Sequence, residues 1–148
     1  MVSLKELANE PTKRAEVIQD ACRVLDQEVA DKSGVSGIAI KTAYKVVQGV
    51  KPGFIPEVVD NLLDDFLDAL EPMRQQAASS GQRPSRYLKD NAGQMADALL
   101  AITDRRAERA QRAMIKKTYE RLRPTAKKHV EAAAPRLGDL VDKHVPDA

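Results

Sequence analysis

The sequence predicts an all-α protein that folds as a compact bundle of five or six helices with short loops. Apolar residues recur every three or four positions along most of the chain, and no run of four or more residues alternates as a strand would. Aromatic residues make up only 3% of the 148 residues, so the core must be aliphatic, with alanine allowing close helix approach. We expect residues 1–148 to form one domain, with a frayed tail at 145–148.

The N-terminal half is expected to contain three helices. The first begins at Pro11 and ends at Lys32-Ser33-Gly34, and the second covers about 36–48. The third begins at Pro56 and carries an unbroken apolar stripe as far as Met73. For the second helix, the residues expected to face inward are Ile40, Ala43, Val46 and Val47.

The C-terminal half follows a loop at 77–84. We expect Ser85 to cap a helix that reaches Leu100, because serine is a favoured N-cap residue. The apolar stripe then changes phase, which predicts a kink or break around Thr103-Asp104 and a basic helix over 105–123. Pro124 is expected to open the last helix.

Charge is unevenly distributed, with a balance of −5 over residues 1–73 and +7 over residues 74–148. On the helix that begins at Pro56, acidic side chains lie opposite the apolar stripe. This acidic ridge comprises Asp60, Asp64, Asp68 and Glu71. Between residues 105 and 128, ten Lys and Arg residues face two Glu residues. The basic ridge taken from this stretch comprises Arg105, Arg109, Arg112, Lys116, Lys117 and Arg123.

Several function classes find no support in these residues. Cys22, the lone cysteine, excludes an intrachain disulfide and is expected to be a buried, inert thiol. The segment 34–42 lacks the spacing of a phosphate-binding loop, and the acidic ridge faces away from the predicted interior, so we expect neither a metal nor another cofactor. Neither His129 nor His144 has a neighbouring nucleophile in the sequence, so no enzyme activity is expected.

The residues at 1–6 do not read as a secretory signal, and no apolar run approaches the roughly 18 residues that a membrane span requires. These observations predict a cytoplasmic protein with no membrane association.

The chain resembles a small bacterial family of all-helical domains of unknown function. The resemblance is carried by short sequence blocks at three places and by the helix containing Ala98-Leu99-Leu100-Ala101. The blocks are Asp31-Lys32-Ser33-Gly34 with Ser36-Gly37, Val50-Lys51-Pro52-Gly53 with Pro56, and Ala126-Lys127-Lys128-His129-Val130. The resemblance covers nearly the whole chain and implies a single cytoplasmic helical domain with no assigned activity. It marks four positions that could share a pocket, namely Lys32, Lys51, Lys128 and His129; caps and turns are the alternative roles.

The two ridges lead to a functional prediction. We expect a non-enzymatic helical domain that acts through its surface, by protein–protein or self-association, with the ridges pairing within the molecule or between copies. The alternative is nucleic-acid binding, with the basic helix over 105–123 contacting the phosphate backbone. Against this alternative, the basic residues lack interleaved aromatics, and the pI of 8.7 is below the usual range for such domains.

Overall fold

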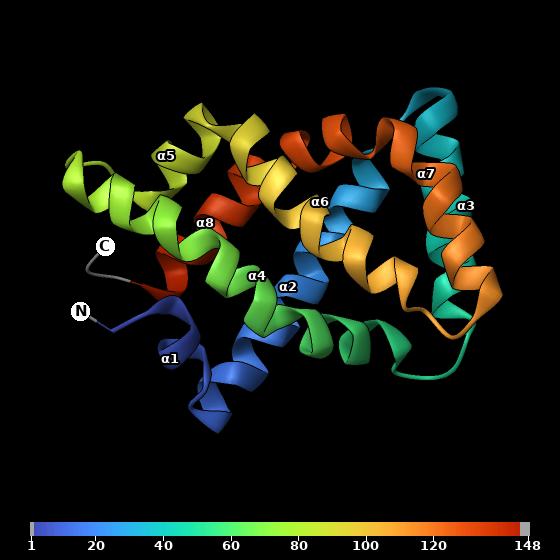
Figure 1. The fold of residues 1–148 in the computed structure, drawn as a ribbon, viewed down its shortest axis with the longest axis horizontal. Helices are drawn as coiled ribbons and strands as arrows, with labels where there is room; N and C mark the ends of the chain where they lie inside the picture. Colours follow the sequence, from blue (N-terminus) through green and yellow to red (C-terminus); the bar gives the residue numbers. More distant parts are fainter. Residues whose placement is uncertain (1, 146–148) are drawn as a thin grey trace.

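The computed structural model describes residues 2–145, and this part of the chain is 85% helical with no strand. The prediction of an all-α fold is therefore confirmed, but the described residues form eight helices rather than five or six. The helices, shown in Figure 1, are α1 (Leu4–Ala8), α2 (Pro11–Asp31), α3 (Gly34–Gln48), α4 (Phe54–Ser79), α5 (Pro84–Asp90), α6 (Ala92–Glu108), α7 (Ala113–Ala132) and α8 (Ala134–His144).

The ends of the chain account for part of the difference. The sequence analysis missed α1, which is only five residues long and has Ser3 as its N-cap. Of the tail predicted to fray at 145–148, only Val145 lies within the described residues. Its relative exposure is only 8%, so it is buried. Fraying is therefore the wrong description for Val145, because its side chain belongs to the hydrophobic core.

The helix predicted to begin at Ser85 is two helices in the structure. Arg83 occupies the N-cap position of α5, and Pro84 takes the first helical position, where its fixed φ suits the helix and its missing N–H costs nothing. Asn91 leaves the helical conformation, with φ −122° and ψ 39°, and separates α5 from α6. The predicted cap at Ser85 is therefore wrong by two residues.

The kink or break was predicted around Thr103-Asp104, but α6 continues through both residues to Glu108, so no break lies there. The interruption lies at 109–112 instead. Since α6 packs against both α4 and α7, its apolar side chains must cover more than one stripe. The change of phase in the sequence reflects this second neighbour and not the end of a helix.

Pro124 does not begin a helix but lies inside α7, which is continuous from Ala113 to Ala132. Its ring prevents the hydrogen bond that a residue at this position would donate to the carbonyl of Glu120. Figure 1 shows α7 changing direction along its length, as an internal proline is expected to cause. The last helix, α8, has Pro135 in its first turn.

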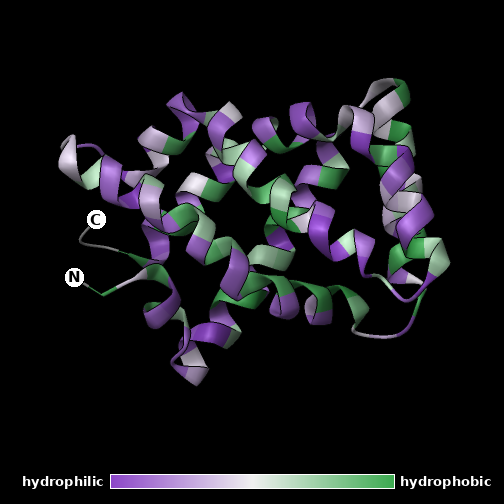
Figure 2. Ribbon diagram, viewed as in Figure 1, coloured by the Kyte–Doolittle hydropathy of each residue, from purple (hydrophilic) through white to green (hydrophobic). Residues whose placement is uncertain are grey.

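The hydrophobic core lies among α1, α4, α5, α6 and α8. It is a single cluster of Leu4, Leu70, Met73, Leu88, Met95, Leu99, Ala134 and Val145. Met95 is its largest fully buried side chain. Hydrophilic and hydrophobic residues alternate along the long helices, so each buries one face and exposes the other (Figure 2).

α3 and α7 lie together at the end of the molecule away from α1 and run antiparallel (Figure 1). In α3 only Gly37 is buried, and α7 has no buried residue. Of the residues predicted to face inward on α3, Val46 is 41% exposed, which contradicts the prediction, whereas the other three are partly buried. This end of the molecule therefore leaves much of its helical surface open.

Among the described residues, no helix combines the length and the apolar character needed to cross a membrane. Cys22 is partly rather than fully buried, and burial raises the pKa of its thiol, as does the nearby Asp26 carboxylate. A raised pKa disfavours the reactive thiolate, in keeping with the inert role predicted for this residue.

Candidate functional site

The basic ridge lies at the junction of α6 and α7, not along one helix as predicted. Arg105 is in the last turn of α6, Arg109 is its C-cap, and Arg112 is the N-cap of α7. Lys116 and Lys117 follow on the exposed side of α7. Because the connection at 109–112 turns the chain between the two helices, the cations surround a corner of the molecule.

Most cations of the basic ridge are free of internal partners. Within residues 2–145, no ion pair engages Arg105, Arg109, Arg112, Lys116 or Lys117, and all five are exposed. The guanidinium of Arg112 lies 6.0 Å from the ring centroid of Phe54, at the outer limit of a cation–π contact. An exposed group of like charges without internal counter-charges can attract an anionic partner.

Arg123 departs from the rest of the ridge because it points toward α6. Its Nε donates to Oδ1 of Asp104 at 2.8 Å, and the hydroxyl of Tyr119 donates to the same carboxylate. These hydrogen bonds hold the pKa of Asp104 below its usual value, while burial and the Asp104 contact raise the pKa of Tyr119 to about 12. Arg123 therefore joins α6 to α7 and, unlike the other members of the ridge, is paired within the molecule.

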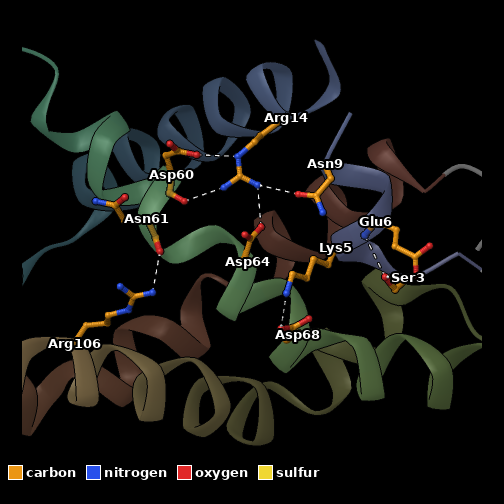
Figure 3. A network of polar contacts seen from close by, with 10 residues as sticks. All are labelled: Ser3, Lys5, Glu6, Asn9, Arg14, Asp60, Asn61, Asp64, Asp68 and Arg106. Carbon is orange, nitrogen blue, oxygen red and sulfur yellow. Dashed lines mark hydrogen bonds and ion pairs between the residues drawn. The ribbon is translucent and has the colours of Figure 1, made fainter. Parts of the chain in front are cut away.

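The acidic ridge is engaged by the N-terminal part of the chain. Arg14 of α2 donates to Asp60 through Nε and to Asp64 through Nη1, both at 2.8 Å, and to the Asp60 carbonyl at 3.0 Å (Figure 3). Lys5 of α1 lies 3.5 Å from Asp68. The hydrogen bonds to Asp64 and Asp60 raise the pKa of Arg14. The ridge thus anchors α1 and α2 on α4.

Glu71, the last member of the acidic ridge, accepts a hydrogen bond from the backbone N–H of Leu4 at 2.6 Å and pairs with Arg74 at 3.0 Å. Arg74 is buried and also donates to the carbonyl of Val2. The acidic and basic ridges do not pair with each other. The nearest link is Arg106, beside the basic ridge, which contacts Asp65 at 2.9 Å.

Two of the four residues marked for a shared pocket are brought together. The Nζ of Lys32 donates to the backbone carbonyl of His129 at 3.2 Å and to the Glu28 carboxylate at 3.1 Å. The side chains of Lys32 and Glu28 are both nearly buried. The His129 ring lies 3.2 Å from the hydroxyl of Ser36. Glu28 also pairs with Arg136 of α8 at 3.3 Å. Sequence reasoning missed Glu28, Ser36 and Arg136. The i,i+4 spacing of Glu28 and Lys32 was a local signal, whereas the contacts of Ser36 and Arg136 are distant in the chain.

The Lys32–His129 cluster is a polar joint between helices. Burial and the positive charges of Lys32 and Lys128 lower the pKa of His129, which keeps its ring neutral at pH 7. The four positions do not form one pocket. Lys51 pairs with Glu57 at 2.9 Å at the start of α4, and Lys128 is exposed on α7.

A second buried polar joint links α2 to α8. Asp20 accepts hydrogen bonds from Lys143 and from Nε2 of His144, each at 2.8 Å, and pairs with Arg23 at 3.1 Å. The contacts with Lys143 and His144 lower the pKa of Asp20. His144 directly precedes the tail that was predicted to fray, yet its side chain is buried. The order of residues along the chain gave no signal of this pairing.

A small cavity lies among α1, α4, α5 and α8, next to Leu4, Met73 and Leu88. Its volume is about 10 Å³, no more than one water molecule needs. Among residues 2–145, no group of three or more His, Cys, Asp or Glu side chains is arranged to hold a metal ion. The open basic surface is therefore the strongest candidate site on the described part of the molecule.

The fold and this surface define an all-α protein with an open cationic corner and buried polar joints between its helices. The chain belongs to a family of unknown function, DUF6918, whose model matches residues 4–145. This finding confirms the resemblance to an all-helical family of unknown function. No curated protein and no solved structure matches the chain.

Proposed function

We propose that this is a non-enzymatic protein that binds an acidic surface of a partner protein through the basic ridge. The observation that supports the proposal is that five of the six ridge cations are exposed and form no ion pair within residues 2–145. Exposed like charges repel one another, and a complementary partner relieves this repulsion and accelerates association. We also propose that this protein acts in the cytoplasm of a bacterium.

A different protein suits the basic ridge better than a second copy of this chain. The carboxylates of the acidic ridge already contact Arg14, Lys5 and the N-terminal backbone, so pairing with another copy would break those contacts. Breaking them would also loosen α1 and α2 from α4. We therefore place the acidic groups on a partner of another kind.

Nucleic acid is the second candidate. Arg105, Arg109, Arg112 and Lys116 are exposed and form no ion pair within residues 2–145, so they are available to contact phosphates. Against it, an exposed apolar side chain lies within the ridge: Met114, between Arg112 and Lys116, is 44% exposed on α7. A partner protein can cover apolar groups, which a phosphate backbone does not.

Charge reversal tests the proposal. The variant Lys116→Glu/Lys117→Glu is compared with Lys13→Glu/Lys89→Glu, which makes the same change in net charge away from the ridge. In nuclease-treated extracts of cells that contain the protein, wild type and the control variant are expected to retain the same partner protein, and the ridge variant to lose it. Equal capture by both variants contradicts the proposal.

Two measurements separate the alternatives. We expect a monomer by size-exclusion chromatography with light scattering at low and high salt, whereas a dimer that dissociates in high salt would indicate self-association. We expect no measurable affinity for mixed-sequence DNA or RNA at about 50 mM salt. Affinity that falls steeply with salt and disappears in the ridge variant would establish nucleic-acid binding instead.

A further inference from the structure

The outward face of α3 carries an uncovered stripe of apolar and small residues. Val35 is 89% exposed, Ile38 66% and Val46 41%. At 100° per residue, the exposed members of this α3 stripe share an arc of about 100°. They are Val35, Ile38, Ala39, Thr42 and Val46. Neighbouring helices leave this face open because α2, α4 and α7 contact α3 elsewhere, on the side that includes the partly buried Ala43 and Val47.

Exposed apolar side chains at helical spacing are typical of a surface that packs against another helix. Single exposed residues are common on protein surfaces, but here three large β-branched side chains share one face. Among the residues that the structure describes, the other exposed large hydrophobic residues are only Val2 and Met114, and Met114 belongs to the adjacent α7. The apolar exposure is therefore concentrated at the α3–α7 end.

The charges on α3 indicate the nature of the missing neighbour. Lys41 and Lys45 are the only charged residues between Gly34 and Gln48, and the helix contains no Asp or Glu. Both lysines are exposed and lie one turn apart along one border of the α3 stripe, and neither forms an ion pair within residues 2–145. A neighbour that covers the stripe and carries acidic groups at its edge would satisfy both features.

We infer that the α3 stripe docks an amphipathic helix of the partner protein, with an apolar face bordered by Asp or Glu side chains that meet Lys41 and Lys45. This inference rests on the proposed function and specifies the partner's chemistry. The partner helix packs its apolar face on Val35, Ile38 and Val46 in the manner of helices in a bundle. Its acidic border gives orientation, since rim charges mainly set register and association rate.

A second copy of this chain fits the stripe poorly. A two-fold symmetric contact places the same surface on both sides, so an α3–α3 interface would contain four lysines and no acid. An anionic membrane would accept the lysines, but the stripe lacks Trp, Phe and Leu, the residues that anchor helices at lipid interfaces. Both alternatives become outcomes of the test below.

Fluorescence anisotropy with a labelled 18-residue peptide tests the inference. The peptide carries leucine on one helical face and glutamate along its borders; a scrambled peptide of the same composition and a peptide with lysine in place of glutamate are controls. Wild type is expected to bind the acidic amphipathic peptide at least tenfold more tightly than either control. Protection of amides in residues 34–48 from hydrogen exchange should accompany this binding.

Variants locate the binding site. Ile38→Ser, on the exposed side of α3, should weaken peptide binding at least tenfold without unfolding the protein, and Lys41→Glu/Lys45→Glu should shift preference to the lysine peptide. Ala132→Ser, an exposed position on α7, is the matched control and should leave binding unchanged. Circular dichroism checks that every variant remains folded.

Other results overturn the inference in distinguishable ways. Loss of peptide binding in Lys116→Glu/Lys117→Glu but not in Ile38→Ser places the partner on the basic ridge alone and leaves the proposed function intact. No binding of the acidic peptide by wild type overturns the α3 site, while the extract experiment still decides the proposed function. Binding to anionic vesicles that Ile38→Ser abolishes identifies a membrane surface, and an α3-dependent dimer identifies self-association.

Discussion

Buried charged side chains in this protein join helices that are far apart in the sequence. Asp20 meets His144 across 124 positions, and Lys32 meets the backbone of His129 across 97. A charge removed from water needs hydrogen-bonding partners. Removing one member of a buried pair leaves the remaining charged group buried without a partner. These contacts therefore select the arrangement in which α2 lies beside α8 and its C-terminal end meets α7.

Asp20 provides a test through pH. The contacts with Lys143 and His144 lower its folded-state pKa, so its stabilising contribution is complete above the unfolded value of 3.8 and is lost as pH falls through the lower folded pKa. Asp20→Asn should reduce the free energy of unfolding by about 2 kcal/mol at pH 7, and the difference should shrink by pH 3. Urea unfolding at both pH values measures it.

The matched control is Asp68→Asn, because Asp68 is 58% exposed and its contact with Lys5 is long. Exposed ion pairs contribute only about 0–1 kcal/mol, so this change should have little effect at either pH. A deficit in Asp20→Asn that is equally large at pH 3 and pH 7 would show that the carboxylate charge is not what stabilises the joint.

A close backbone approach gives a second residue-scale prediction. A Cβ atom added at Gly138 would lie 2.6 Å from Cα of Ser85, where α8 crosses α5. Gly138→Ala should therefore destabilise the protein by about 1–3 kcal/mol, since the helices must move apart. Gly93→Ala is the control, because its nearest neighbour would be 3.7 Å away and alanine favours helix. Shifts of urea midpoint in the same direction for both variants would contradict this account.

At the scale of helices, the sequence predicts strong amphipathic segments well and short or doubly packed ones poorly. The long α4 follows its apolar stripe closely, beginning two residues before Pro56. α1 was missed because five residues contain little more than one turn of periodicity. The interruption after α6 was misplaced because a helix with two neighbours has two apolar faces.

The candidate site shows the same division between local and distant information. The exposure of Lys116 and Lys117 could be predicted, because their place on the polar face of a helix is set by local spacing. The partners of Arg123 and His129 could not, because they depend on which helices meet. The exposure of Ile38 also follows from packing, since nothing in the sequence distinguishes the covered side of α3 from the open one.

α1 gives the prediction at this scale. An isolated helix of five residues is unstable in water, so α1 depends on burial of Leu4 and on the hydrogen bond from its N–H to Glu71. Glu71→Ala should accelerate hydrogen exchange of the amides in residues 4–8 at least tenfold while exchange in α6 stays unchanged. Glu57→Ala, which removes an exposed pair with Lys51, should leave α1 protected. Equal protection in both variants would show that α1 does not need Glu71.

For the whole molecule, one core draws on both halves of the chain. Leu4 from α1, Met95 from α6 and Val145 after α8 belong to the same cluster. Elements that share a core lose their stability together, so we expect one cooperative urea transition for residues 1–148. Midpoints measured by far-ultraviolet circular dichroism and by tyrosine fluorescence should coincide. Two separate transitions would contradict the single-domain prediction.

The position of Val145 in that cluster has a consequence for synthesis on the ribosome. Ala134 and Val145 complete a core whose first member, Leu4, is made more than a hundred residues earlier. A nascent chain that has emerged only as far as α7 therefore leaves the apolar faces of α4, α5 and α6 exposed to solvent. Until α8 has also emerged, this exposed apolar surface makes the partly folded chain prone to aggregation.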